Sequence, residues 1–459
     1  MKQESYQLTP HPIGSLREMW QVSYPLILSF LSGSIMMFCD RMFLANYSLQ
    51  ALNACANAGN VVWLFLVVPM LICGITEVFV GQHHGAGNYK RMGEPTWQML
   101  WFCLMIIPIF VLVATFASPI LFYQTGNEVL ETEFFSHMLY FGSFMCAYPA
   151  LCGFFVGKGS VRLITYCTII DCTLNVILDP LFIFGWGFIP SMGVKGAAIA
   201  TGLSNVFGVG LLLSVFLRQK YRSRYGTSNW SFRFNTFKEC IKVGFPAGIG
   251  QLNEVIAHCV FFRLAIMAGG HSITIAALTQ SFYISVIFIL QGVSKGVITI
   301  AANLIGGGQS QLVHKVLLSA VRLICIFAAL FSFVLLGGNE ALFGMMMSSA
   351  DQVLLQDPNF TTVLNNTCLF LCLFFLFDGV TQIFAGLLTA AGDTQFLMWI
   401  GIVFNWLLYV MPVFVVLYVF ELGIDKAWLV LAVCSMSMAT AYYWRYRTRN
   451  WHALAALST

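Results

Sequence analysis

Two carboxylic acids and an amide lie inside one of the apolar stretches of this chain. The stretch TIIDCTLNVILDPLFIF, residues 168–184, contains Asp171, Asn175 and Asp179. Residues spaced by four are offset by only about 40° around a helix axis, so these three side chains share one face. A carboxylate at the centre of a bilayer costs about 2.5–3.5 kcal/mol even on the lenient insertion scales, so something on that face must interact with them.

Asp40 lies in another apolar stretch, about 24 Å beyond Tyr24 along a helix, and therefore in the outer part of a membrane. The neighbouring Arg41 points about 100° away and is expected to snorkel outward, an exit that Asp40 does not have. Asp40, Asn175 and Asp179 together offer two acids and an amide. That set suits a proton or Na⁺, but it is too small for an all-protein Ca²⁺ site.

Further ionisable residues occur inside other apolar stretches, and each has two readings. They are Glu77, Glu254, Arg263, Lys295 and Asp378. An ionisable residue inside a membrane often marks a substrate or ion pathway. The alternative is a snorkelling or internally paired charge that only positions helices.

The composition identifies the elements that must carry these residues. The 459 residues are 59% hydrophobic and only 9% charged, whereas soluble domains are roughly 25% charged. We therefore expect an all-α polytopic membrane protein.

The net charge of +4 does not indicate nucleic-acid binding, because the basic residues lie in loops. The 14 Cys lack metal-ligand spacing and are interpreted as core residues. No signal peptide is expected at the N-terminus.

Apolar runs long enough to cross a bilayer recur along the whole chain and predict twelve spans. The predicted spans lie near residues 21–45, 60–82, 96–118, 134–156, 162–184, 195–217, 240–266, 272–303, 317–338, 362–388, 395–420 and 425–444.

The distribution of Lys and Arg predicts the orientation of these spans. Basic residues occur in the N-terminal segment (Lys2, Arg17), in the even-numbered loops and in the C-terminal RYRTRNW. The odd-numbered loops are poor in them, with Lys195 and Lys426 as minor exceptions. Because cytoplasmic loops carry the excess of Lys and Arg, both termini are expected in the cytoplasm, with the protein in the plasma (inner) membrane.

The two halves of the chain resemble each other. Three pairs of segments match: REMWQVSYP (17–25) with KECIKVGFP (238–246), QHHGAGN (82–88) with NLIGGGQ (303–309), and GFFVGKGSVR (153–162) with GLLTAAGDTQ (386–395). The first two pairs share one displacement along the chain, which we call the repeat offset. Six spans per half is an even number, so the halves enter the membrane the same way round. They are predicted to be parallel repeats with a cavity at their interface, an architecture of secondary transporters.

This division predicts four regions. They are a first lobe at 1–217, a basic cytoplasmic inter-lobe loop at 218–238, a second lobe at 239–444 and a basic cytoplasmic tail at 445–459.

GFFVGKGS lacks the first Gly of a phosphate loop, so no ATPase is predicted. Energy is expected from an ion gradient or from the gradient of the substrate, and no cofactor is expected.

The chain resembles the multidrug and toxic compound extrusion (MATE) transporters over essentially its whole length. The resemblance is carried by the order and spacing of YPLILSFLSGSIMMFCDRMFLAN, GQHHGAGNYKR, NVILDPLFIFG, GVKGAAIATGLSN and GFPAGIGQLNEV. It implies twelve helices in two six-helix lobes and cation-coupled export of drugs. It also implies a first-lobe cation site at Asp40, Asn175, Asp179, Ala197 and Thr201.

The resemblance implies further roles in both lobes. Pro25 matches the proline at which the first helix bends in some members. Glu254 and Asp378 match acids of the NorM-type branch that are implicated in cation binding. One turn before Asp378, that branch often has Tyr, whereas this chain has Phe374.

Three charges lie outside the family pattern. Asp171 is either a neighbour of the first-lobe site or a structural residue. Glu77 and Lys295 are opposite in charge and are interpreted as packing or gating charges. Glu254 also has a structural alternative, in which it is an ion-pair partner of Lys295.

The expected function is an antiporter, working as a monomer, that exports lipophilic or cationic drugs in exchange for H⁺ or Na⁺ by alternating access. The sequence does not decide between the two ions. An aromatic content of 15% suits a cavity for flat organic cations. The alternative is a flippase of lipid-linked precursors from the same superfamily, which would have a cavity rich in Arg and Lys. A membrane-embedded transferase is not expected, because no reactive constellation occurs at one membrane face.

Overall fold

The computed structural model describes residues 8–187, 189–269, 272–338, 342–343 and 355–448. These residues form eleven helices that are long and apolar enough to cross a membrane, and a bent pair of helices provides a twelfth span. The expectation of an all-α polytopic protein with twelve spans is therefore confirmed. The predicted tail at 445–459 is described only as far as Thr448, and Lys2 lies outside the described residues.

The helices of the first lobe occupy the first half of the chain. They are α1 (Leu16–Tyr47), α2 (Leu49–Gly74), α3 (Thr76–Gly85), α4 (Gly93–Phe116), α5 (Ser118–Leu121), α6 (Glu128–Tyr140), α7 (Gly142–Gly157), α8 (Val161–Ile183) and α9 (Gly193–Phe216). The short α10 (Gln219–Tyr225) follows them.

The helices of the second lobe follow the inter-lobe segment. They are α11 (Phe234–Met267), α12 (Ser272–Gly306), α13 (Val313–Gly337), α15 (Pro358–Ala390), α16 (Thr394–Phe404), the π-helical segment η5 (Asn405–Val410), α17 (Met411–Phe414), the π-helical segment η6 (Val415–Val419) and α18 (Ile424–Thr448).

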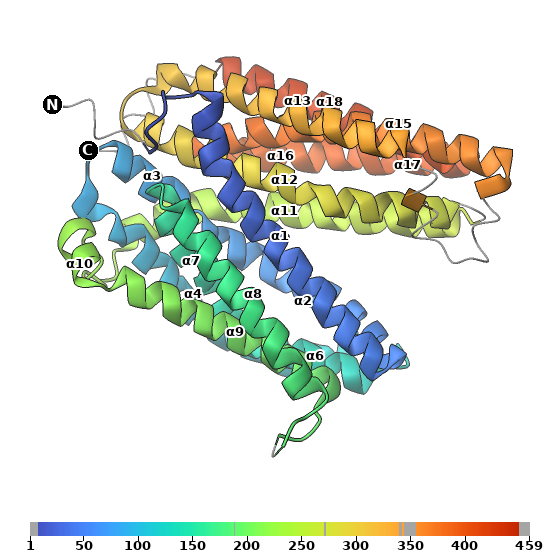
Figure 1. Cartoon of the computed structure of the whole chain (residues 1–459), viewed down its shortest axis with the longest axis horizontal. Coiled ribbons are helices and arrows are strands. Elements are labelled where there is room, and N and C mark those ends of the chain that lie inside the picture. The colour runs from blue at the N-terminus through green and yellow to red at the C-terminus, as the bar shows by residue number, and fades with distance from the viewer. Residues whose placement is uncertain (1–7, 188, 270–271, 339–341, 344–354, 449–459) are drawn as a thin grey trace.

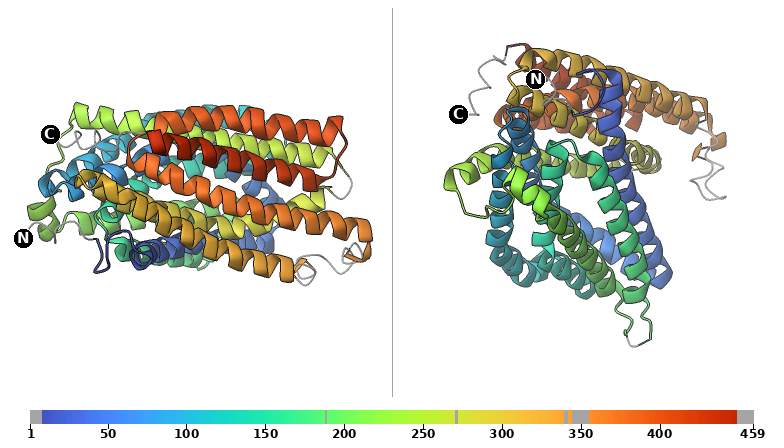
Figure 2. Two further views of the ribbon diagram at one scale, coloured as in Figure 1. Left: turned by 90° about the horizontal axis from the view of Figure 1, so that it is seen from above. Right: turned by 60° about the vertical axis from the view of Figure 1, so that its left-hand side comes forward.

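The two lobes form a V in space. Figure 1 shows them meeting near the end of the molecule where the described chain begins and finishes, and diverging toward the opposite end. The same divergence is visible in the right-hand view of Figure 2. We call the first of these ends the terminal end and the other the far end.

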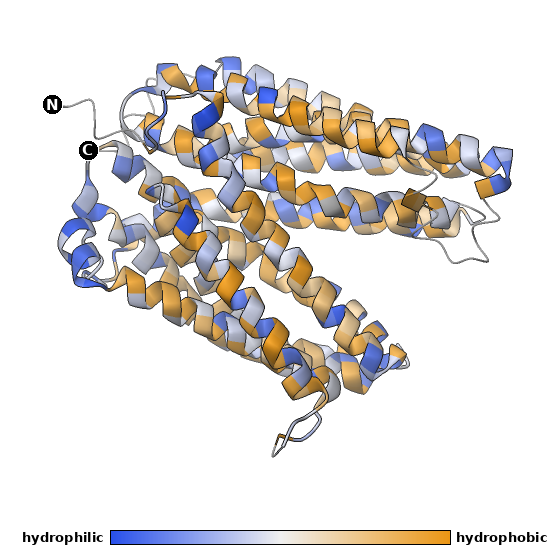
Figure 3. Cartoon of the chain, viewed as in Figure 1, coloured by the Kyte–Doolittle hydropathy of each residue, from blue (hydrophilic) through white to orange (hydrophobic). Residues whose placement is uncertain are grey.

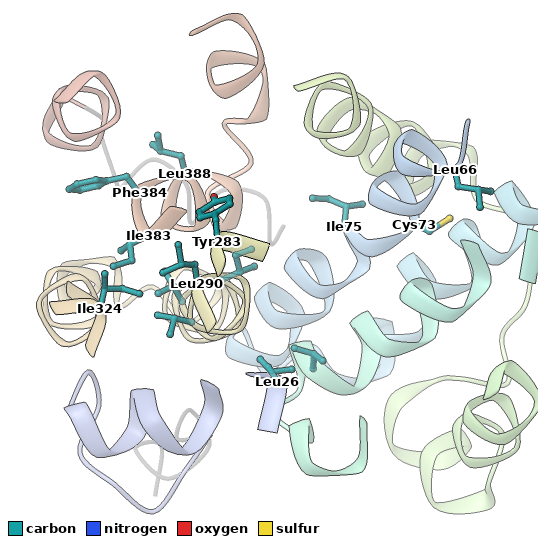
Figure 4. Close-up of a cluster of buried hydrophobic side chains, with 14 of the residues drawn as sticks. Leu26, Leu66, Cys73, Ile75, Tyr283, Leu290, Ile324, Ile383, Phe384 and Leu388 are labelled. Atoms are coloured by element: carbon teal, nitrogen blue, oxygen red, sulfur yellow. The ribbon is translucent and has the colours of Figure 1, made fainter. Parts of the chain in front are cut away.

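The first helix of each lobe crosses to the other lobe. α1 packs against α8 of its own lobe and also against α12, while α11 packs against α16 and also against α2. Buried apolar side chains fill both lobes, as Figure 4 shows for Leu26, Leu66 and Ile75 of the first lobe and Tyr283, Leu290 and others of the second. The two crossing helices therefore tie the lobes together.

The outer surface of the helices is apolar. Figure 3 shows hydrophobic residues along the length of the bundles and hydrophilic residues concentrated toward their ends. Large apolar side chains such as Ile120 and Phe333 are 78% and 79% exposed. Surface of this kind is expected where a helix faces lipid, and it agrees with a multi-pass membrane protein.

Two predicted spans differ from the structure in outline. The second span is predicted to begin near residue 60, but α2 begins at Leu49, because the Ser48 hydroxyl accepts a hydrogen bond from the Ala51 N–H and caps the helix. The fourth span, predicted as one helix over 134–156, is bent by 44° between α6 and α7. Gly142 and Ser143 stand at the bend, and such pairs are common sites of helix kinks.

The lobes meet through reciprocal hydrogen bonds that follow the sequence repeat. Asn303 Nδ2 donates to the Gly157 carbonyl oxygen at 2.8 Å, and Gln82 Nε2 donates to the Ala390 carbonyl oxygen at 2.9 Å. The repeat offset relates Gln82 to Asn303, and the third segment match relates Gly157 to Ala390. Each lobe therefore makes the same contact to the other, as parallel repeats require.

Two glycines repeat this reciprocity at the backbone level. A Cβ atom at Gly85 would collide with the carbonyl oxygen of Asn303, and one at Gly306 would collide with the carbonyl oxygen of Gln82. Gly85 and Gly306 are again related by the repeat offset. Only glycine permits so close an approach of the two lobes.

Candidate cation-binding sites

The first-lobe site forms where α1 packs against α8. Asn175 and Asp179 are fully buried on α8, at 0% exposure each. The carboxyl group of Asp40 on α1 faces that of Asp179 closely enough for the two to interact. The packing of these helices is fixed in part by Thr165 on α8, whose hydroxyl donates to the carbonyl oxygen of Pro25 at 2.7 Å.

α9 contributes the remaining predicted members of this site. Asn175 Nδ2 donates to Thr201 Oγ1 at 3.4 Å, and the Thr201 hydroxyl donates to the Ala197 carbonyl oxygen at 3.0 Å. The structure thus places Asp40, Asn175, Asp179, Ala197 and Thr201 at the junction of three helices. Their role in binding a cation stays a prediction.

The oxygen atoms at this junction lack donors. Asp40 Oδ1, Asn175 Oδ1 and both carboxyl oxygens of Asp179 are buried without a hydrogen-bond partner, and no Lys or Arg among the described residues pairs with either acid. Buried polar atoms are nearly always satisfied, so a group of bare oxygens needs an explanation. A proton shared between the acids, or a cation held by these oxygens, would satisfy them.

Asp171 lies on the same face of α8, two turns before Asp179. Its Oδ1 is also buried without a partner. It lies against α9, where a Cβ atom at Gly208 would be only 3.1 Å from Asp171 Oδ1. The Tyr148 hydroxyl, which interacts with Thr168 Oγ1 at 3.0 Å, lies on the neighbouring α7. The charge of Asp171 is unpaired within the described residues.

The second-lobe site joins α11, α12 and α15. Asp378 on α15 accepts a hydrogen bond from the Tyr283 hydroxyl on α12 at 2.9 Å, and Glu254 on α11 accepts one from Gln251 Nε2 at 3.3 Å. Asp378 lies close enough to Glu254 to interact with it electrostatically. The structure therefore brings the two predicted acids into one region, as a joint role would require.

Aromatic rings surround this pair of acids. Phe374 packs against Tyr283 with ring centroids 5.1 Å apart and against Trp428 at 6.0 Å, while Phe261 packs against both Trp428 and Tyr409. Tyr409 Oη and Trp428 Nε1 are buried without a hydrogen-bond partner. Aromatic faces and buried acids together favour a positively charged occupant.

Sequence reasoning missed two polar members of the second-lobe site. His258 lies one turn after Glu254, and its Nδ1 is 3.2 Å from the Glu254 carbonyl oxygen. Tyr283 could not be found from spacing, because it comes from another helix. It donates the hydroxyl hydrogen bond to Asp378 that the phenyl ring of Phe374 cannot donate. The only signal in the sequence for either residue was His258 itself, one turn after Glu254 in NEVIAH.

The two accessory charges form an ion pair. Lys295 Nζ on α12 is 2.8 Å from Glu77 Oε2 on α3, and the Thr299 hydroxyl donates to Glu77 Oε1 at 2.9 Å. Lys295 therefore pairs with Glu77 and not with Glu254, so the structural alternative proposed for Glu254 is wrong in this respect. Nowhere in the described part of the chain do three His, Cys, Asp or Glu side chains gather as a metal site.

Comparison with known proteins agrees with this architecture. The chain is 24% identical over 449 residues to a probable multidrug resistance protein NorM of Thermotoga maritima, covering 94% of this chain and 91% of that protein. It is 23% identical to an FAD transporter of Shewanella oneidensis, covering 71% and 73%. A solved structure of a MOP superfamily transporter from Pyrococcus furiosus superimposes with a TM-score of 0.84 at 18% identity, covering 99% of each chain.

The family assignment follows from a match along both lobes. The sequence model of the family described as MatE matches residues 25–181 and 246–415, which include every candidate residue named above in α1, α8, α11 and α15. The chain therefore belongs to the MatE family, whose members are transporters rather than enzymes.

Proposed function

We propose that this protein is an antiporter that exports lipophilic or cationic drugs from the cell in exchange for H⁺ or Na⁺. The observation that carries the proposal is the pair of buried acid sites, one in each lobe, in which no acid is paired with Lys or Arg among the described residues. Unpaired acids inside a membrane protein are costly and typically mark an ion or substrate pathway.

The first-lobe acids would carry the coupling ion. Asp40 and Asp179 face each other, and Asp179 is fully buried, so both cannot be ionised at low cost. A proton shared between them, or Na⁺ bound by their oxygens with the Asn175 amide oxygen, removes this conflict. Loss of that ion restores a negative charge that can attract an organic cation.

Alternating access would connect the ion to the drug. The basic loops lie at the terminal end, so we assign that end to the cytoplasm and the diverging far end to the outside. An ion would then enter from the far end, and its binding would favour release of the drug on that side. Separation of the lobes at the terminal end, with closure at the far end, would return the empty site to the cytoplasm.

The charges of the buried residues support a cationic substrate over an anionic one. Among the described residues, Asp171, Asp179 and Asp378 are buried acids that form no ion pair with Lys or Arg. A flippase of lipid-linked precursors, whose phosphate groups are anionic, would need buried Arg or Lys. The flippase alternative is therefore disfavoured.

Transport by the purified protein in proteoliposomes tests the proposal. Export of an ethidium-like dye is measured with an imposed pH gradient, with an imposed Na⁺ gradient and with neither. Acceleration by one gradient supports antiport and identifies the ion. Dye movement that ignores both gradients, or that only follows the dye's own gradient, would rule out the antiport.

A further inference from the structure

One buried ion pair joins the two lobes. Glu77 on α3 belongs to the first lobe, and its two carboxylate oxygens face the second lobe. One lies 2.8 Å from Lys295 Nζ, and the other lies 2.9 Å from the Thr299 hydroxyl, whose single proton is shared with the Lys295 carbonyl oxygen at 2.9 Å. The Glu77 side chain is only 3% exposed, whereas that of Lys295 is 33% exposed. The buried acid thus depends on the opposite lobe for its partners.

The pair lies on the helices that form the closest contact between the lobes. Gly81 follows Glu77 by one turn of α3, and a Cβ atom there would be 2.9 Å from Ala302 Cβ on α12. Gly85, another turn along, touches the backbone of Asn303. Movement of α3 away from α12 would therefore separate Glu77 from Lys295 and Thr299.

The repeat does not account for this pair. The repeat offset relates Glu77 to Ile298, Lys295 to Gly74 and Thr299 to Val78, and none of these counterparts is polar. The close contacts of Gln82 with Ala390, of Asn303 with Gly157, and of Gly85 and Gly306 are reciprocal. The ion pair, like the contact of His84 Nδ1 with Asn303 Oδ1 at 2.6 Å, has no counterpart in the repeat and is an addition to that shared interface.

We propose that Glu77, Lys295 and Thr299 form a latch that holds the lobes together at the terminal end and must open in each transport cycle. The latch rests on the proposed alternating access, which requires the terminal end to open. Separation of the lobes would leave the buried Glu77 carboxylate without its partners, which is strongly unfavourable. Lys295 is more exposed and can be hydrated, so the free-energy cost of separation arises mainly from Glu77. The pair thereby favours the state in which the terminal end is closed.

Distances between spin labels measure the latch directly. One pair of labels at the exposed Ser223 and Gln311 reports on the terminal end, and another at Tyr123 and Phe420 reports on the far end. The accessible cysteines Cys39, Cys152, Cys259 and Cys325 are replaced beforehand. Glu77→Gln should raise the ratio of open to closed terminal ends by about tenfold and lower the transport rate, because the resting equilibrium is displaced.

Charge reversal separates a latch from a general packing role. Glu77→Lys combined with Lys295→Glu should restore the closed distance that either single reversal loses. Asp393→Asn is the matched control, because it removes an ion pair to Arg445 of similar exposure and length that lies within the second lobe. This control should leave both distances unchanged. If Glu77→Gln does not yield folded protein, Thr299→Val gives a milder form of the same test.

The outcomes distinguish the latch from the proposed function. If the wild-type terminal-end distance never changes with dye, pH or Na⁺, alternating access itself fails. If that distance changes in the wild type but Glu77→Gln and Thr299→Val leave its distribution unaltered, the latch alone is wrong. The latch is also wrong if the double reversal behaves no better than the single reversals while remaining folded.

Discussion

In the first lobe, Asp40 and Asp179 face each other with buried oxygens that no donor satisfies. In the second lobe, Asp378 accepts a hydrogen bond from Tyr283, and Glu254 accepts one from Gln251. Two ionised carboxyl groups so placed would repel each other, whereas the acids of the second pair keep hydrogen-bond donors when they are ionised. The lobes therefore hold their acids in chemically different ways.

The repeat explains why this difference exists. By the repeat offset, Asp40 corresponds to Phe261, and Glu254 corresponds to Gly33. Phe261 is 1% exposed and is one of the aromatic rings near the second-lobe acids, in ring contact with Trp428. The position of the acid Asp40 in the first lobe is thus occupied in the second lobe by an aromatic ring beside a different site. The two lobes share the helical scaffold but not the positions of their acidic residues.

The largest expected effect is on cysteine labelling, which tests whether the two lobes have the same orientation in the membrane. Each introduced cysteine should be either fully labelled from outside the cell or not labelled at all. If the halves are parallel repeats, a cysteine at Gly126 in the first lobe and one at Gly338 in the second should both be labelled from outside the cell. A cysteine at Ser228, in the inter-lobe segment, should be labelled only after the membrane is opened. Labelling of the Ser228 position in intact cells would contradict the topology.

Neutralisation of the first-lobe site should have the next largest effect. Asp40→Asn keeps the shape of the side chain but removes its charge, so gradient-driven export should fall by roughly a hundredfold or more, equivalent to about 2.7 kcal/mol. Asp179→Asn should be severe and Asn175→Ala milder. Expression and thermal stability serve as controls. Export of an ethidium-like dye by Asp40→Asn at the wild-type rate would remove this site from the mechanism.

The second-lobe acids should behave as one unit. Glu254→Gln and Asp378→Asn should each slow coupled export by about tenfold, or 1.4 kcal/mol, and the double variant should be little worse than the worse single one. Tyr283→Phe removes only the donor to Asp378, a loss of about 1 kcal/mol or roughly fivefold. Independent losses that multiply in the double variant would show that the two acids act separately.

Much of the fold could be predicted from the sequence because lipid-facing helices carry their signal in long apolar runs. The spans near residues 162–184 and 195–217 correspond closely to α8 and α9. The early start of α2 escaped prediction because it depends on the cap at Ser48. The bend at Gly142 escaped prediction because a Gly–Ser pair permits a kink without requiring one. The face shared by Asp171, Asn175 and Asp179 followed from helical spacing alone.

The sites were predictable only in part. The grouping of Asp40 with Asp179 was predicted from their chemistry and from the resemblance, and that of Glu254 with Asp378 from the resemblance alone. Neither could come from spacing, because each pair joins separate helices. Tyr283 was missed for the same reason: which face of α12 meets α15 is decided by packing in three dimensions. The pairing of Glu77 with Lys295 was suggested by their opposite charges, but its position between the lobes was not.

Substitution of Asp171 should have the smallest effect on export, and it tests a further difference between the acids of the first lobe and those of the second. The Asp171 side chain is buried, its Oδ1 has no hydrogen-bond partner, and it lies against Gly208 of α9. If it is a neighbour of the ion site, Asp171→Asn should slow coupled export by about two- to threefold, about 0.5 kcal/mol, without loss of stability. Export and thermal unfolding are measured together.

A structural role for Asp171 predicts the reverse pattern. A buried carboxyl group without a donor is unfavourable for folding, so its replacement by Asn or Leu would then stabilise the protein and leave export unchanged. Gly208→Ala provides a complementary perturbation that keeps the charge, since its added Cβ would lie 2.9 Å from the Tyr148 ring and 3.1 Å from Asp171 Oδ1 and would displace both. If Gly208→Ala slows export as much as Asp171→Asn does, the position of the carboxyl group matters as well as its charge, and the first-lobe site extends one turn farther along α8 than Asn175.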